Sequence, residues 1–173
     1  MAGDVIIKKA RITDAVEIQN LLYLTWIDTY VNKKSNISLE DVASINFLSP
    51  ENISRREMKI KNIDKNSDIL VAKYNNKIIG ECSFEKKDYY GIIKSIYVLP
   101  DFQNRGVGSD LYRSVLKEMP NISNIKIEVS KYNDKAFKFY SKLGFKKNNT
   151  SGEYVFPNGK SLSIFGMEVN LNI

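Results

Sequence analysis

The chain of 173 residues contains no histidine and only one cysteine. Without histidine, a histidine general base, a histidine-assisted nucleophile and a histidine-ligated zinc ion are all excluded. Proton transfer is left to carboxylates, tyrosine, lysine or water, and we expect no metal. The single cysteine, Cys82, cannot form a disulfide within the chain. Its position in an apolar strand pattern favours a buried structural residue over a nucleophile.

Long hydrophobic runs and an N-terminal targeting segment are also lacking. No stretch is apolar over the length that a bilayer requires, and residues 1–12 alternate quickly between charged and apolar side chains. We therefore expect a cytoplasmic protein that does not bind a membrane.

The charge balance is basic, with a formal net charge of +6 from 26 basic and 20 acidic residues. The basic residues are scattered among acidic ones, and the dense basic patches are short, such as Lys8-Lys9. This distribution does not favour nucleic acid binding. A positive surplus near an anion site suits a ligand that carries several phosphates.

The expected elements indicate one α+β domain over residues 1–173, with a helical insert at about residues 32–66. A helix is expected from Asp14, with Glu17 at capping-box distance, and further helices in the insert. Strands are expected at residues 5–10, 69–74, 77–84, 92–99, 125–129, 154–156 and 161–165, because apolar and β-branched residues recur there between turn residues. This order predicts a mixed, largely antiparallel twisted sheet with helices on both faces.

A glycine-rich turn follows the apolar segment 92–99, and it has the order Gln103-x-x-Gly106-x-Gly108. Glycine lets the backbone approach an anion closely, and a helix expected from about Ser109 would direct its free N–H groups to the same charge. The spacing matches neither the Walker A loop nor the dinucleotide fingerprint. Taken alone, the pattern also fits an ordinary strand-to-helix turn.

A second motif lies about thirty residues further on and has the order Asn133-x-x-Ala136-x-x-Phe139-Tyr140-x-x-x-Gly144. Asn133 or Asp134 is expected to cap a helix that stops at the glycine. Together the two motifs resemble the GCN5-related N-acetyltransferases, and the resemblance extends over most of the chain. Within that family, residues 26–30 and the helical insert are similar to the PaiA-type polyamine acetyltransferases.

The resemblance implies acetyl-coenzyme A as cosubstrate, held in a splay between the strands at 92–99 and 125–129. The backbone of Ile96, Tyr97 and Val98 would bind the pantetheine arm and the thioester. Asn133 would bind the pantetheine arm or the following strand, unless it acts only as a helix cap. The pyrophosphate would be held by the turn residues Asn104, Arg105, Gly106, Val107, Gly108 and Ser109.

The resemblance also suggests residues that move protons. Tyr140 matches the family tyrosine that protonates the coenzyme A thiolate, although a core tyrosine would fit the same helix face. The strand before the turn carries Lys94 where many members place a glutamate. Glu128 matches the base of bacterial ribosomal-protein acetyltransferases and would act through a water; the alternative is a solvated carboxylate paired with Lys126. Glu81 is a weaker candidate.

The acceptor is expected to be a primary amine of a small molecule, most simply a polyamine such as spermidine or spermine. Trp26, Tyr30 and Tyr97 would line its pocket, although core packing also explains the tryptophan. Acidic residues would balance its charge, and the candidates are Glu81, Asp28, Glu85 and Glu128. The alternatives are a protein N-terminal or lysine acetyltransferase and a catalytically weak coenzyme A-binding regulator, in each case a monomer or a homodimer.

Overall fold

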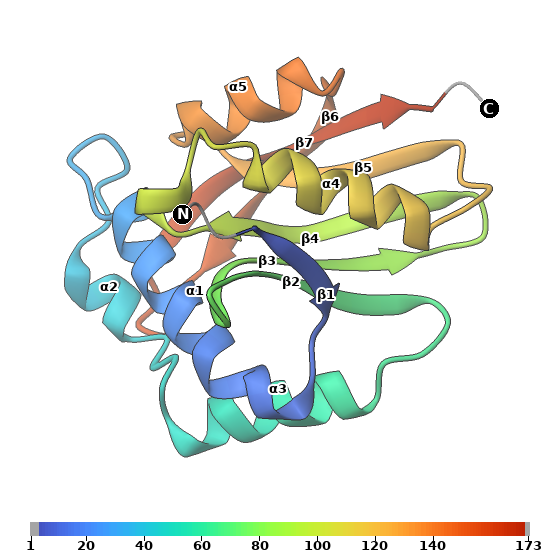
Figure 1. Cartoon of the computed structure of the whole chain (residues 1–173). Helices are drawn as coiled ribbons and strands as arrows, with labels where there is room; N and C mark the ends of the chain where they lie inside the picture. Colours follow the sequence, from blue (N-terminus) through green and yellow to red (C-terminus); the bar gives the residue numbers. More distant parts are fainter. Residues whose placement is uncertain (1–3, 172–173) are drawn as a thin grey trace.

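The computed structural model describes residues 4–171. One seven-stranded sheet runs through it in the order β1-β2-β3-β4-β5-β7-β6, with helices on both faces (Figure 1). The β4–β5 pair is parallel and the other neighbouring pairs are antiparallel. The elements are β1 (Ile6–Lys9), α1 (Ala15–Tyr30), α2 (Leu39–Ala43), α3 (Pro50–Lys61), β2 (Ser67–Tyr74), β3 (Lys77–Lys86), β4 (Tyr90–Val98), α4 (Val107–Glu118), β5 (Asn124–Ser130), α5 (Asp134–Lys142), β6 (Lys146–Val155) and β7 (Ser161–Asn170). The predicted α+β class and mixed sheet are confirmed.

Two hydrophobic cores flank the sheet. On one face α4 buries Val107, Leu111 and Val115, which recur at the helical spacing of an apolar stripe. On the other face α1 buries Ile18 and Leu22 against the sheet and the insert helices. The residues around Tyr140 belong to the first core and those around Trp26 to the second, so the sheet separates two groups of candidate site residues.

Local residues account for the hairpin turn and two helix caps. Asn75 and Asn76 have φ values of 48° and 65°, the left-handed conformation that a two-residue hairpin turn between β2 and β3 requires. The Ser38 hydroxyl accepts a hydrogen bond from the Asp41 N–H at 3.1 Å and caps α2. Ser49 caps α3 in the same way.

The start of α1 differs from the prediction. A 3-10 turn (Ile12–Asp14) precedes the helix, and the Asp14–Glu17 capping box does not form. The Asp14 carboxylate accepts a hydrogen bond from the Arg11 N–H at 2.9 Å and pairs with Lys73 of β2 at 2.6 Å. Glu17 instead accepts from the Ile78 N–H of β3 at 2.7 Å. Both carboxylates therefore fasten the helix to the sheet.

Two element boundaries also differ. Helix α4 begins at Val107, before the expected Ser109, and β6 begins at Lys146 rather than near residue 154. Strand β6 is polar and exposed along most of its length, because it forms an edge of the sheet and is paired only with β7. Its residues therefore lack the apolar alternation that identified the inner strands.

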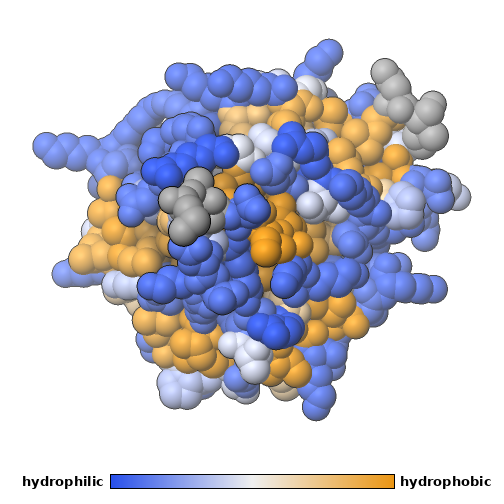
Figure 2. Space-filling model, viewed as in Figure 1, coloured by the Kyte–Doolittle hydropathy of each residue, from blue (hydrophilic) through white to orange (hydrophobic). Residues whose placement is uncertain are grey.

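The surface in this view is mainly hydrophilic, with hydrophobic side chains in separate patches (Figure 2). Within residues 4–171, no helix has the length and apolar content that a membrane span requires.

Candidate active site

The middle of the sheet opens where β4 and β5 part. The two strands are in register only from Tyr90↔Asn124 to Ile93↔Ile127. Beyond this point β4 remains paired with β3, and β5 remains paired with β7. Across the described chain, the β5-facing edge of β4 has no strand partner from Lys94 to Val98. Backbone groups on such an edge are free to pair with an extended ligand, and the predicted Ile96, Tyr97 and Val98 lie on it.

The glycine-rich turn lies at the end of this free edge. The Gln103 side-chain amide donates to the Val98 carbonyl at 3.0 Å and fixes the turn to β4. Gly106 occupies the N-cap of α4 with φ +87°, and within residues 4–171 no side chain accepts from the first-turn N–H groups. These N–H groups and the helix dipole favour an anion at this end.

The two glycines of the turn serve different purposes. A Cβ at Gly106 would have Asp110 Oδ2 at 4.0 Å as its nearest neighbour, so the positive φ rather than crowding requires glycine. Gly108 lies inside α4, and a Cβ there would meet the Phe139 ring at 3.3 Å. Gly108 has an ordinary helical backbone, and its lack of a side chain lets α4 pack closely against α5.

The remaining turn residues have distinct surroundings. Asn104 has a positive φ of 59°, and the Arg105 guanidinium lies 5.6 Å from the centre of the Phe102 ring. Val107 is buried in the core, so only its backbone can face a ligand. Ser109 is half-buried in the first turn of α4.

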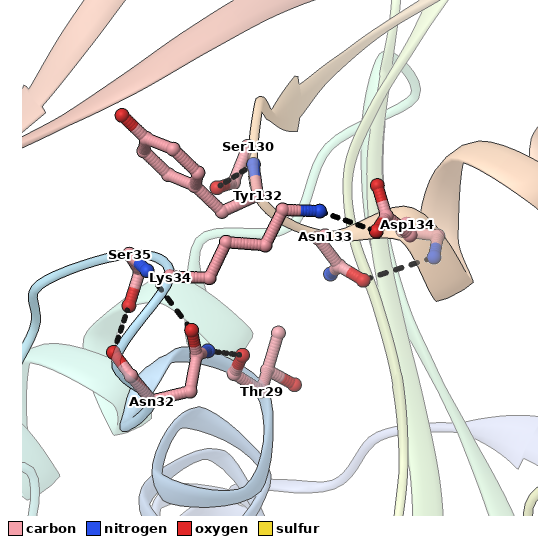
Figure 3. A network of polar contacts seen from close by, with 9 residues as sticks. Thr29, Asn32, Lys34, Ser35, Ser130, Tyr132, Asn133 and Asp134 are labelled. Carbon is pink, nitrogen blue, oxygen red and sulfur yellow. Dashed lines mark hydrogen bonds and ion pairs between the residues drawn. The ribbon is translucent and has the colours of Figure 1, made fainter.

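Asn133, one of the two residues expected to cap α5, does so. Its side-chain oxygen accepts from the Ala136 N–H at 2.9 Å. Figure 3 shows that the loop after α1 lies beside this cap, with the Lys34 ammonium pointing to Asp134, and the pair is 2.5 Å apart. A second ion pair, Lys135–Asp28 at 3.9 Å, also joins α1 to α5.

Tyr140 lies on α5, where 4% of its surface is exposed. Its ring packs edge-on against Phe139 and Phe145, with centroids 5.0 and 5.4 Å away. Burial raises the pKa of Tyr140 well above the ordinary tyrosine value, and the nearby Cys82, Tyr30 and Glu81 raise it further. The hydroxyl therefore stays protonated at neutral pH, which is the form that donates a proton.

The acidic residues differ in burial and pairing. Glu81 on β3 is 1% exposed, and within residues 4–171 neither carboxylate oxygen has a hydrogen-bond partner. Glu128 on β5 is exposed and has no ion pair among the described residues. Lys126 does not pair with it, because its ammonium lies over the Tyr90 ring at 4.5 Å. Asp28 pairs with a lysine of α5, and Glu85 with Lys87 and Lys94 at 3.3 and 3.4 Å.

The part of the chain that forms the parted strand pair and the glycine-rich turn also matches a known protein family. Residues 36–145, which include the turn, the free edge of β4 and the Asn133–Tyr140 motif, match the acetyltransferase (GNAT) family. The chain belongs to this family.

Relatives and solved structures extend the comparison. The GNAT chain is 28% identical over 101 residues to protein YqkA of Bacillus subtilis, with 58% of this chain and 29% of that protein covered. It is also 28% identical over 85 residues to an uncharacterised N-acetyltransferase of Mycobacterium bovis, with 47% and 54% covered. The chain thus spans about half or less of these curated relatives. The PaiA N-acetyltransferase of Thermoplasma acidophilum, solved with coenzyme A, has the same fold, with a TM-score of 0.79 and 22% identity over 97% of this chain and 99% of that chain.

On the α1 face of this GNAT fold, the predicted acceptor residues form one aromatic cluster. The Tyr30 and Tyr97 hydroxyls are 3.2 Å apart. Trp26 lies at the centre, with ring centroids at 4.9 Å from Tyr30, 5.1 Å from Tyr154, 5.5 Å from Phe47, 6.0 Å from Phe156 and 6.3 Å from Tyr97. Trp26 is therefore part of the core and is also a candidate lining residue of the acceptor pocket.

A polar cleft of about 490 Å³ lies beside the end of β5. The Lys131 N–H donates to the Ser163 carbonyl at 3.0 Å, so the cleft lies where the end of β5 meets β7. Its lining comes from three loops and the start of β7: Ser35, Asn36, Tyr132, Gly159, Lys160, Ser161 and Ser163. The sequence carried no signal for these residues, because they come together only in the fold. The described residues contain no group of three or more acidic or cysteine side chains arranged to hold a metal ion.

Proposed function

We propose that the protein transfers the acetyl group of acetyl-coenzyme A to a primary amine of a small molecule. The observation that carries this proposal is the free edge of β4, which ends at an uncapped helix N-terminus. An extended arm that ends in a pyrophosphate needs this pair of features, backbone groups along a line and N–H groups at one end.

The residues of the edge and the turn fit such a cosubstrate. Backbone groups of Ile96, Tyr97 and Val98 would bind the pantetheine arm and hold the thioester carbonyl. The backbone from Asn104 to Ser109 would donate to the pyrophosphate, and Gly106 keeps that path free of a side chain. Asn133 would contribute its side-chain N–H groups, because its oxygen is already used by the cap.

We assign Tyr140 as the general acid. The amine nitrogen forms a bond to the thioester carbon, the carbon–sulfur bond breaks, and the leaving thiolate takes the hydroxyl proton of Tyr140. The proton lost by the acetylated nitrogen then restores the tyrosine. Holding the reactants together supplies much of the rate in such a transfer.

For the acceptor we propose a polyamine, with spermidine and spermine as the first candidates. Such a substrate needs negative charge inside a chain of net charge +6. Of the four candidate acidic residues, Asp28 and Glu85 are paired with lysines. Glu81 and Glu128 have no ionic partner among the described residues and supply this charge. Trp26, Tyr30 and Tyr97 would line the approach.

The general base, which removes a proton from the acceptor amine, is either Glu81 or Glu128. Glu128, the assignment suggested by the resemblance, is exposed and would take the proton through a water molecule. Glu81 is buried beside Tyr97.

The proposed function is tested by measuring thiol release from acetyl-coenzyme A with spermidine, spermine, a peptide with a free N-terminus, and no acceptor. We expect the two polyamines to raise thiol release well above the rate without acceptor. Turnover with the peptide alone would assign the protein to N-terminal or lysine acetylation. Tight binding of acetyl-coenzyme A without turnover would indicate a regulator.

A further inference from the structure

Glu81 is a buried carboxylate to which the described part of the fold provides no hydrogen-bond donor. Both of its oxygens lie out of contact with solvent and have no hydrogen-bond partner within residues 4–171. The Ser95 hydroxyl on β4, which lowers the pKa of Glu81 in part, is paired with Ser83 at 2.7 Å. Burying an unpaired carboxylate is costly. A position that carries such a cost in the middle of a strand is a candidate for function.

The location of Glu81 connects it to the proposed reaction. It lies directly opposite Tyr97 in the β3–β4 pair, so both side chains are on the same face of the sheet. Tyr97 is also the residue whose backbone lies on the free edge of β4. The Glu81 carboxylate contributes to the raised pKa of the Tyr140 hydroxyl on α5. Glu81 on β3 and the proposed acid on α5 therefore interact electrostatically although they belong to different elements.

We propose that Glu81 is the general base that takes one proton from the acceptor's ammonium group. This rests on the proposed function. The ammonium ion binds to the Glu81 carboxylate and gives it one proton, which leaves a neutral amine with a free electron pair to attack the thioester carbon. After the transfer, Glu81 releases this proton to solvent. An amine substrate also supplies the cationic partner that the carboxylate lacks.

The surroundings of Glu81 favour this role over Glu128. Burial raises the pKa of Glu81, while Arg56 and Lys59 of α3 and the Ser95 hydroxyl lower it in part. The raised value brings the carboxylate closer to the pKa of an amine, so the proton transfer is less uphill. Tyr97 also faces Glu81, and burial raises the pKa of Tyr97 and keeps its hydroxyl neutral. Glu128 is exposed to water on β5.

The test compares Glu81→Gln with Glu128→Gln and with a control, Glu85→Gln. The control changes the same side chain on the same strand, at a position paired with surface lysines. Each variant is assayed with acetyl-coenzyme A and spermidine across a range of pH. Calorimetric binding of acetyl-coenzyme A and a melting curve establish that each variant is folded. Glu81→Met serves as a second variant with an apolar side chain of similar length.

We expect both Glu81 variants to lower kcat/KM on the order of 10²–10⁴-fold and to lose the fall in activity on the acidic side of the pH profile. Affinity for acetyl-coenzyme A should stay within about twofold, and Glu85→Gln should resemble the parent. The proposal would be overturned if Glu81→Gln kept the parent's fall in activity at acidic pH, or if its kcat/KM fell by less than about threefold. If Glu128→Gln shows the large loss instead, the base is Glu128. A parent that acetylates no amine contradicts the proposed function and not the assignment of the base alone.

Discussion

The hydroxyl groups of Tyr30 and Tyr97 lie 3.2 Å apart and join the last residue of α1 to the free part of β4. Burial raises the pKa of both tyrosines. Both hydroxyls therefore stay neutral across the usual assay range. This contact connects the helix that carries Trp26 to the strand expected to hold the thioester.

Removing one of these hydroxyls should weaken the contact between α1 and β4. Tyr97→Phe leaves the Tyr30 hydroxyl without its partner, which should lower the free energy of unfolding by about 1 kcal/mol. Because the ring stays in place, we expect the KM for the acceptor to rise more than kcat falls. Denaturant unfolding and steady-state kinetics measure the two effects. Unchanged stability and an unchanged KM would show that the hydroxyl pair contributes neither to the stability of the fold nor to acceptor binding.

Gly106 should be essential for binding acetyl-coenzyme A. Gly106→Ala places a Cβ at φ +87°, which strains the backbone by about 1–2 kcal/mol, and the Cβ projects toward the proposed path of the pyrophosphate. The matched control is Gly144→Ala, with a similar φ of +91° at the end of α5. Calorimetry should show at least a tenfold loss of affinity for Gly106→Ala alone, with similar destabilisation of both. Equal affinities in the two variants would place the pyrophosphate elsewhere.

Tyr140→Phe should lower turnover on the order of 10²–10⁴-fold, because it removes the proton donor. It keeps the ring contacts with Phe139 and Phe145, so binding of acetyl-coenzyme A should change little. Tyr112→Phe is the control, since Tyr112 is also buried and packs against Phe145 at 5.9 Å. The comparison needs conditions in which chemistry limits the rate. Turnover of Tyr140→Phe within twofold of the control would remove this hydroxyl from the mechanism.

Glu81 should cost the protein stability at neutral pH. Its pKa is raised by burial, so between the ordinary carboxyl pKa and the raised value the folded state binds more protons than the unfolded state. The free energy of unfolding therefore falls as pH rises through this window. Glu81→Met should be more stable than the parent at pH 7, on the order of 1 kcal/mol or more. The difference should shrink as the pH approaches the ordinary carboxyl value.

Unfolding by urea at several pH values measures this difference. Glu85 provides a control of opposite sign: although partial burial raises its pKa, Lys94 and Lys87 lower it on balance. The stability that the Glu85 carboxylate contributes is present above the ordinary carboxyl pKa, and it is lost as the pH falls through the lowered pKa. A Glu81→Met variant that is less stable than the parent at pH 7 would show that the carboxylate is satisfied in the fold.

The sequence allowed the features with local causes to be predicted. The turn between β2 and β3 follows from Asn75 and Asn76, the cap of α5 from Asn133, and the conformation at Gly106 from the absence of a Cβ. Each depends on residues close together in the chain. The fold class followed from the order of such elements and from the family resemblance.

Features that depend on distant contacts were missed or misjudged. The carboxylates at the start of α1 bind β2 and the hairpin, not the helix itself. Glu81 stands in an ordinary strand pattern, which does not reveal that its carboxylate is buried without a hydrogen-bond partner among the described residues. Phe47, Tyr154 and Phe156 join Trp26 only because the insert and the last hairpin meet α1.

The central claim is that the protein moves an acetyl group from acetyl-coenzyme A to an amine nitrogen. The most direct measurement uses acetyl-coenzyme A with an isotopically labelled acetyl carbonyl and follows the label into spermidine by mass spectrometry while free thiol is counted. The predicted result is one labelled N-acetyl group for each thiol released, with both signals reduced in parallel in Tyr140→Phe. Thiol release without label on spermidine or any other amine, or no consumption of acetyl-coenzyme A at all, would contradict the account.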